Sequence, residues 1–265
     1  MSKSVAEELQ FLANTKTSEI WKSVSSVIMT IVDEAYFEAG PEGLTFRSMD
    51  PSHIALIDLS WPKSGFEKYE CPYTTKFGLK ISDFAKIIKR SNSNDSIEIY
   101  LKDNSLNIKT TGGYTRNYRM NLVEGDAANT SPLPKLSLDS KIVIGTYALD
   151  KILSDIQVMS DNLTIETVNG KKNVIFSGSS DNGNAIIDVG YDKSNTEIPM
   201  LQDMTVKENS KCSYNMDYIS KIVKILNSSS DTITLEYSSK KPLRLESVLL
   251  NDIKMQFFLA PRVDN

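Results

Sequence analysis

Gly40-Pro-Glu-Gly-Leu-Thr-Phe46 has a near copy 130 positions further on, Gly170-Lys-Lys-Asn-Val-Ile-Phe176. Ile57-Asp-Leu59 and Ile187-Asp-Val189 are related at the same offset. A third pair, Ile81–Lys89 and Met216–Lys224, is offset by 135 positions. Such a repeat, at about half of a 265-residue chain, predicts two tandem copies of one domain. We therefore expect the function to lie in what the two copies build together.

The composition is that of an ordinary globular protein, with 40% apolar and 24% charged residues. No stretch approaches the ~18 consecutive apolar residues of a membrane span, and the first residues lack the apolar run of a secretory signal. We therefore expect an intracellular protein. Cys71 and Cys212 are too few for a disulfide scaffold or a thiolate metal site, so we expect free thiols.

Most of the sequence alternates with the period of two that is typical of β-strands. Tyr114, Tyr118, Met120 and Leu122 alternate with polar residues, which predicts a strand with one buried face. Turn signals such as Gly112-Gly113 separate the strands. Further strands are expected at 44–46, 54–59, 96–101, 163–168 and 232–237.

Four segments have helical spacing of apolar residues instead, and they fall two to each copy. These segments are Thr17–Ile28, Ile81–Lys89, Tyr147–Gln157 and Met216–Leu226. The pattern predicts an α+β fold with antiparallel sheets and the helices on one face. We expect an N-terminal domain at 1–126, a Pro-punctuated connector at 127–140 and a C-terminal domain at 141–265.

Lysines repeat on the polar faces of the predicted helices. Lys86 and Lys89 lie opposite the apolar face of their helix, and Lys221 and Lys224 take the same positions in the second copy. Lys22 and Lys151 form a further pair, offset by 129 positions. Although the net charge is −4, one basic face of this kind would hold a phosphate backbone without reading its sequence.

Motifs for catalysis are absent from the sequence. His53 is the single histidine, and there is no phosphate-binding Gly-rich loop, no HExxH and no Cys/His cluster. We expect no catalytic residue, no metal and no cofactor. An enzyme with a carboxylate site that these patterns do not reveal is an alternative, which metal-dependent nuclease activity of a purified preparation would support.

Two segments resemble a known family. Ser48-Met-Asp-Pro-Ser-His53-Ile-Ala-Leu56 and the terminal Phe257-Phe-Leu-Ala-Pro261 are similar to the proliferating cell nuclear antigen (PCNA) family, the DNA sliding clamps of archaea and eukaryotes. The resemblance runs from about Phe11 to Pro261 and is more archaeal, given a short N-terminal extension and no long acidic C-terminal tail. It implies a homotrimeric ring with six-fold pseudosymmetry, in which helices line the hole and sheets form the outer wall.

The resemblance also implies roles for individual residues. The residues expected to face DNA are Lys22, Lys86, Lys89, Lys151, Lys221 and Lys224. The family often has further basic residues where this chain has Ser154 and Asp217. The expected partner-peptide groove consists of Met49, His53, Ile54, Leu56, Leu133, Pro134, Leu136, Pro242, Phe258, Ala260 and Pro261. The expected subunit interface consists of Arg116, Tyr118, Met120, Asn184, Ile186 and Asp188, on two edge strands.

The resemblance identifies the chain as a non-enzymatic sliding clamp and processivity factor. It would encircle duplex DNA and tether DNA polymerase, flap endonuclease, DNA ligase and clamp loader for replication and repair. It would work in the cytoplasm and nucleoid of an archaeon or in a eukaryotic nucleus. Two alternatives stay open: a subunit of a heterotrimeric replication or checkpoint clamp, and a monomeric two-domain scaffold that binds peptides without closing on DNA.

Overall fold

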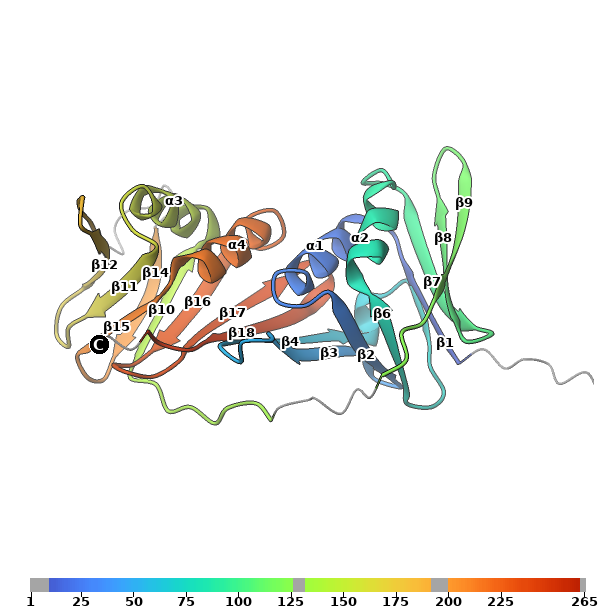
Figure 1. The fold of residues 1–265 in the computed structure, drawn as a ribbon, viewed down its shortest axis with the longest axis horizontal. Helices are drawn as coiled ribbons and strands as arrows, with labels where there is room; N and C mark the ends of the chain where they lie inside the picture. The colour runs from blue at the N-terminus through green and yellow to red at the C-terminus, as the bar shows by residue number, and fades with distance from the viewer. Residues whose placement is uncertain (1–9, 126–131, 192–199, 263–265) are drawn as a thin grey trace, which may run out of the picture. The chain divides into compact units, whose positions relative to one another are not determined.

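The computed structural model describes residues 10–125, 132–191 and 200–262 (Figure 1). The chain divides into two compact units. Unit 1 consists of Met1–Pro51, Ile57–Ser131 and Leu249–Lys254. Unit 2 consists of Ser52–Leu56, Pro132–Val248 and Met255–Asn265.

The two halves of the chain contain the same succession of elements, β-α-β-β-β-β-β-α-β-β-β, apart from short 3-10 turns. In the first half these are β1 Phe11–Thr15, α1 Glu19–Ile28, β2 Glu34–Gly40, β3 Gly43–Met49, β4 Ala55–Pro62, η1 Lys63–Gly65, β5 Lys68–Glu70, β6 Thr75–Lys80, α2 Ile81–Lys89, β7 Ser96–Lys102, β8 Ser105–Thr111 and β9 Thr115–Asn121. In the second half they are β10 Ser140–Gly145, α3 Thr146–Gln157, β11 Asn162–Thr167, β12 Asn173–Ser180, β13 Gly183–Gly190, β14 Leu201–Val206, β15 Ser210–Asn215, α4 Met216–Leu226, β16 Thr232–Tyr237, β17 Leu243–Leu249, η2 Leu250–Asp252 and β18 Ile253–Leu259.

The strand order repeats as well. The first half has the orders β5-β1-β7-β8-β9 and β4-β3-β2-β6, and the second half has β14-β10-β16-β17-β18 and β13-β12-β11-β15. Every strand of the first half therefore has one counterpart in the second. Phe46 on β3 and Phe176 on β12 are such counterparts, and their strands pair antiparallel with β2 and β11. The predicted α+β fold of two tandem copies is confirmed.

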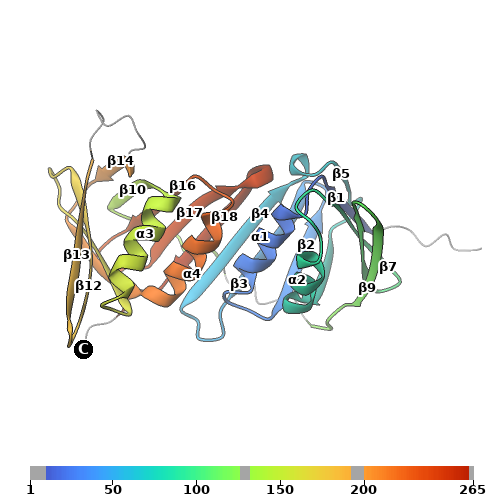
Figure 2. The ribbon, with the colours of Figure 1, turned by 90° about the horizontal axis from the view of Figure 1, so that it is seen from above.

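Two helices cover the sheets in each unit, α1 beside α2 and α3 beside α4 (Figure 2). The apolar residues that predicted these helices are buried, among them Ile81, Phe84 and Ile88 on α2. Trp21 of α1 and Trp61 of β4 pack with ring centroids 4.7 Å apart inside unit 1. Burial of these faces supplies most of the helical stability, because isolated helices this short are marginal in water.

Two sequence predictions need correction. Helix α1 begins at Glu19, later than the predicted Thr17, because Ser18 donates its hydroxyl to the Asn92 carbonyl (2.7 Å) and its N–H to the Ser93 carbonyl (3.3 Å). The predicted buried face of the 114–122 strand is only half-buried at Tyr118, and Tyr114 is exposed. The reason is that β9 is the outermost strand of its sheet and has β8 as its one neighbour there.

The connector predicted at 127–140 lies partly outside the described residues, which resume at Pro132. From there to Asp139 the described chain forms neither helix nor strand, and β10 begins at Ser140. The domain bounds stay a prediction. Both cysteines are buried free thiols, as predicted. Within the three described ranges no helix is long and apolar enough to cross a membrane.

Candidate functional site

The predicted DNA-facing lysines lie on the helix faces turned away from the sheets. Lys86 and Lys89 are exposed on α2, whereas Ile81, Phe84 and Ile88 are buried. On α4 Lys221 and Lys224 are exposed in the same way, and Lys151 is exposed on α3. Lys22 on α1 is half-buried. Each unit thus presents lysines on two neighbouring helices.

Three of the six lysines are bound to carboxylates of their own helices. The Nζ–carboxylate distances are 2.9 Å for Lys22–Glu19, 2.8 Å for Lys86–Asp83 and 2.6 Å for Lys221–Asp217. The hydrogen bond from Lys86 lowers the pKa of Asp83, and that bond raises the pKa of Lys86. Hydrogen bonds from Ser93 and then Lys22 lower the pKa of Glu19. Any phosphate that binds these lysines must compete with an acceptor already in place.

Lys89, Lys151 and Lys224 form no ion pair with the described residues. Lys151 lies over the Tyr147 ring, with Nζ 5.4 Å from the centroid. Six lysines and five carboxylates on the four helices leave a net charge of only +1. Helix α3 is acidic by itself, and Ser154 donates to the Asp150 carbonyl within it (2.8 Å). The positive field is therefore strongest on α2 and α4.

The predicted groove residues fall in unit 2, except Met49, which is half-buried at the end of β3. The Ala260 N–H donates to the Ile54 carbonyl at 2.8 Å, which brings the C-terminal segment beside Ser52–Leu56. Leu56 and Phe258 are buried and serve as packing, whereas Ile54 is 37% exposed. His53 is exposed and has a left-handed backbone with φ of 59°.

The connector also lies close to the groove residues of unit 2. Lys241 Nζ donates to the Ser137 carbonyl at 2.8 Å, which fixes the connector next to Pro242. Leu133, Pro134 and Leu136 are half-buried, as are Pro242, Ala260 and Pro261. Their apolar side chains are thus neither fully packed into the core nor fully exposed. The structure thus links the C-terminal segment to Ser52–Leu56 and the connector to Lys241, and the groove itself stays a prediction.

The predicted interface residues lie on two strands at sheet edges, β9 and β13. Ile186 on β13 is 64% exposed, and Asn184 and Asp188 are exposed beside it. An edge strand presents unpaired N–H and C=O groups, which makes it a template for another strand. On β9, Tyr118 and Met120 are half-buried on the same face. Whether the two edges meet in an assembly stays a prediction.

Arg116 has an internal role that sequence reasoning missed. Its guanidinium pairs with the buried Asp95 carboxylate and donates to the Arg90 carbonyl at 2.6 Å, at the end of α2. It also stacks on Tyr114, 4.7 Å from the ring centroid. A Cβ at position 112 would lie 1.9 Å from Asp95 Oδ1, so the backbone of Gly112 approaches the carboxylate that Arg116 binds. The Gly112-Gly113 turn thus makes room for a buried carboxylate.

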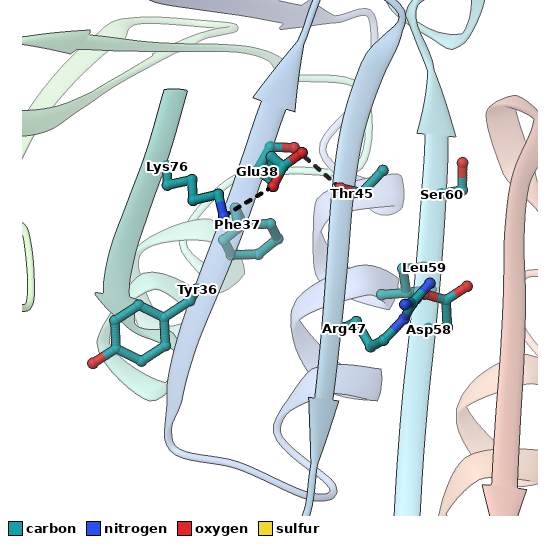
Figure 3. Close-up of a pocket in the computed structure, with 9 residues that line it drawn as sticks. All are labelled: Tyr36, Phe37, Glu38, Thr45, Arg47, Asp58, Leu59, Ser60 and Lys76. Carbon is teal, nitrogen blue, oxygen red and sulfur yellow. Dashed lines mark hydrogen bonds and ion pairs between the residues drawn. The ribbon is translucent and has the colours of Figure 1, made fainter. Parts of the chain in front are cut away.

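A polar hollow of about 420 Å³ lies on the outer face of β6-β2-β3-β4 in unit 1 (Figure 3). Its charges are matched in pairs, Arg47–Asp58 at 2.6 Å and Lys76–Glu38 at 3.3 Å. The second pair recurs in unit 2 as Lys211–Glu166 at 3.0 Å, on the counterpart strands β15 and β11. The described residues include no group of His, Cys, Asp and Glu that could hold a metal ion.

These features define a class: a scaffold of two α+β copies with lysine-bearing helices, open sheet edges and an apolar connector region. The chain belongs to the proliferating cell nuclear antigen family, because the family's N-terminal domain model matches residues 10–124 and its C-terminal domain model matches residues 132–263. The resemblance stated from the sequence is confirmed.

Relatives with the name DNA polymerase sliding clamp extend over nearly the whole chain. That of Nitrosopumilus maritimus (strain SCM1) is 44% identical, and that of Cenarchaeum symbiosum (strain A) is 43% identical; each match covers 97% of this chain and 100% of the relative. The crystal structure of PCNA from Thermococcus kodakaraensis has a TM-score of 0.86 at 22% identity and covers 95% of this chain and 100% of that one. The structure of the C-terminal region of FEN-1 bound to A. fulgidus PCNA has a TM-score of 0.83 at 23% identity and covers 96% and 99%. At these identities the two structures show the fold.

Proposed function

We propose that this chain is a DNA sliding clamp that acts as a polymerase processivity factor. The observation that carries the proposal is the repeat of lysine positions on α2 and α4, in a chain 44% identical over 97% of its length to a DNA polymerase sliding clamp. A repeat preserves a packing pattern for stability, but an exposed lysine has no packing reason to be kept at the same position of both copies.

The proposed mechanism is sequence-independent contact with duplex DNA. Lysines that neutralise phosphates release counterions and give affinity without a preferred register. Contacts of this kind let a ring move along the duplex while its closure prevents dissociation. We infer that three copies close the ring by pairing β9 of one copy with β13 of the next, because both strands have open edges. A head-to-tail contact of two different edges is the geometry that generates rings.

Enzymes would be held through a peptide segment in the region of Ile54, Leu133, Leu136 and Pro261. The structure named for FEN-1 bound to A. fulgidus PCNA supports such tethering for a relative of the same fold. DNA polymerase, flap endonuclease, ligase and clamp loader are the partners we propose, and the chain itself contributes no chemistry. Its contribution is a raised effective concentration of each enzyme at its DNA substrate. The protein would act inside the cell, where the chromosome lies.

The solution mass tests the ring. Light scattering at several concentrations should give about three times the 29.6 kDa of one chain. A mass of one chain at every concentration would contradict the homotrimer, and a ring regained only on mixing with sister chains would establish the heterotrimeric alternative.

The groove is tested separately, by polymerase stimulation on primed DNA. Leu133→Ser with Leu136→Ser should abolish stimulation and leave the mass unchanged. The matched control is Val158→Ser with Leu250→Ser, at exposed apolar residues outside the proposed groove. Full stimulation by the Leu133/Leu136 variant would remove the connector from the partner site.

A further inference from the structure

A second hollow, of about 570 Å³, lies in unit 2 beside the C-terminal segment. Its walls are the edge of β15 at Lys211–Ser213, the turn Ser239-Lys240 and the tail residues Pro261 and Arg262. Strand β15 is an edge of its sheet, so its outward backbone groups need partners from elsewhere. The Ser239-Lys240 turn and the C-terminal tail supply these hydrogen-bond partners, and the hollow lies between them and the strand.

Hydrogen bonds fix each wall. The Arg262 N–H donates to the Ser213 carbonyl at 2.8 Å, and the Lys211 N–H donates to Ser239 Oγ at 3.0 Å. The buried Tyr214 hydroxyl donates to the Lys241 carbonyl at 3.0 Å, which holds the turn from below. The hollow is thus a preformed feature of unit 2, since every wall is attached to the sheet.

The charged side chains that line this hollow are all cations: Lys211, Lys240 and Arg262. Lys211 forms an ion pair with Glu166. Arg262 donates a hydrogen bond to the neutral side-chain amide of Asn162. Lys240 is exposed and has a left-handed backbone with φ of 58°, a conformation in which glycine would be less strained. The hollow of unit 1 differs in its charge, because each of its two cations, Arg47 and Lys76, forms an ion pair with a carboxylate that also lines that hollow.

The hollow is continuous with the proposed partner groove. Pro261 belongs to both, and Lys241, next to Lys240, holds the connector through the Ser137 carbonyl. A peptide seated on the connector and the tail would therefore carry its flanking residues past three cations. This favours a peptide over nucleic acid as the occupant, because the cations come from a strand, a turn and the tail, not from the exposed faces of α3 and α4.

We propose that this hollow is a subsite for acidic residues that flank the partner segment, and that it makes this clamp select partners with acidic flanks. The inference rests on the proposed groove and adds a specificity to it. Carboxylates in the flank would hydrogen-bond to Lys240 and Arg262, which are the two cations without a carboxylate partner among the described residues.

Fluorescence anisotropy with the full chain tests the subsite. The probes are three labelled synthetic peptides that share one apolar central segment and are flanked at both ends by glutamates, serines or lysines. Exposed ion pairs of this kind should make the glutamate peptide bind about fivefold more tightly than the serine peptide at low salt. The preference should shrink as salt is raised.

Charge-reversal variants locate the effect. Lys240→Glu with Arg262→Glu should abolish the preference for the glutamate peptide and leave the serine peptide unaffected. Lys141→Glu with Lys172→Glu makes the same charge change at exposed lysines outside the hollow and should keep the preference. Lys240→Gly, which relieves the left-handed strain, gives a second variant that should fold and should weaken the preference in part.

The outcomes separate the subsite from the groove. Equal binding of all three peptides would overturn the subsite while the groove stands. Binding of none of them would refute the groove, and the subsite with it. A short duplex that displaces the glutamate peptide from the wild-type chain, and binds the Lys240/Arg262 variant more weakly, would overturn the proposal in favour of a nucleic-acid surface.

Discussion

Lys89 and Lys224 should contribute more to DNA binding than Lys86 and Lys221, although all four are exposed on the same faces of α2 and α4. Lys86 and Lys221 are hydrogen-bonded to Asp83 and Asp217, whereas Lys89 and Lys224 form no ion pair with described residues. A lysine already neutralised by its own helix releases few counterions when a phosphate approaches. We therefore compare Lys89→Ala with Lys224→Ala against a charge-neutral control that removes both pairs, through Lys86→Gln, Asp83→Asn, Lys221→Gln and Asp217→Asn.

The expected magnitude follows from counterion release. Each phosphate contact contributes about 0.9 to the slope of log K against log salt concentration for duplex DNA. Loss of Lys89 and Lys224 should thus lower the slope by up to about 1.8 for each chain that contacts the duplex. The charge-neutral control should change the slope by well under half as much, because it removes no free cation.

The assay is anisotropy of a short labelled duplex, titrated with each protein over a range of salt concentrations. Asp83→Asn with Asp217→Asn serves as a third variant that frees the paired lysines, and it should raise both affinity and slope. Equal slopes for the Lys89/Lys224 variant and the wild-type chain would refute the reasoning. So would a control variant that loses as much as the Lys89/Lys224 variant.

Three other perturbations probe the edge strands and the core. Ile186→Asp should dissociate the assembly in light scattering, whereas Val158→Asp, at an even more exposed apolar residue off the edge strands, should not; a persistent oligomer would show that β13 is not the joint. Arg116→Leu should lower the free energy of unfolding in urea by about 3 kcal/mol, because it leaves the buried Asp95 carboxylate without its ion-pair partner. Adding Asp95→Leu should restore much of the lost stability. A loss below about 1 kcal/mol for Arg116→Leu would contradict the importance of the pair. Burial raises the pKa values of Cys71, Tyr214 and Tyr237, so these groups ionise first in the unfolded chain. The free energy of unfolding should be complete below about pH 8, begin to fall above about pH 8.5, where an unfolded cysteine ionises, and fall more steeply above about pH 10, where unfolded tyrosines ionise; Tyr214→Phe should flatten the part of the fall above about pH 10.

The sequence predicted the repeat and the helices well because both depend on local periodicity. The apolar spacing on α2 and α4 is unambiguous, and the two copies reinforce one another. The start of α1 was misplaced because Ser18 is bound by Asn92 and Ser93, which are distant in sequence. The half-buried face of β9 was misjudged because alternation shows which residues share a face but not what covers it.

The candidate site was less accessible to sequence reasoning. The positions of the lysines follow from helical spacing, but their ion pairs with Asp83 and Asp217 depend on side-chain rotamers, which spacing alone leaves open. Arg116 was assigned to an interface because the family resemblance placed it on a strand at the subunit joint, and its bond to Asp95 joins residues 21 positions apart, which no local pattern connects. The cationic hollow joins a strand, a turn and the tail, which no local pattern connects.

The lysine–carboxylate pairs on the helices have a mechanical consequence for a ring that encloses a duplex. In the proposed clamp, a lysine that leaves one phosphate as the duplex advances would return to the carboxylate on its own helix, which lies 2.6 to 2.9 Å away in the resting pairs. One charge-assisted hydrogen bond is exchanged for another, so no bare ammonium has to form between steps. The pairs would thus lower the energy barrier between successive positions of the ring on the duplex. An advancing enzyme would then need little force to move the ring along the axis.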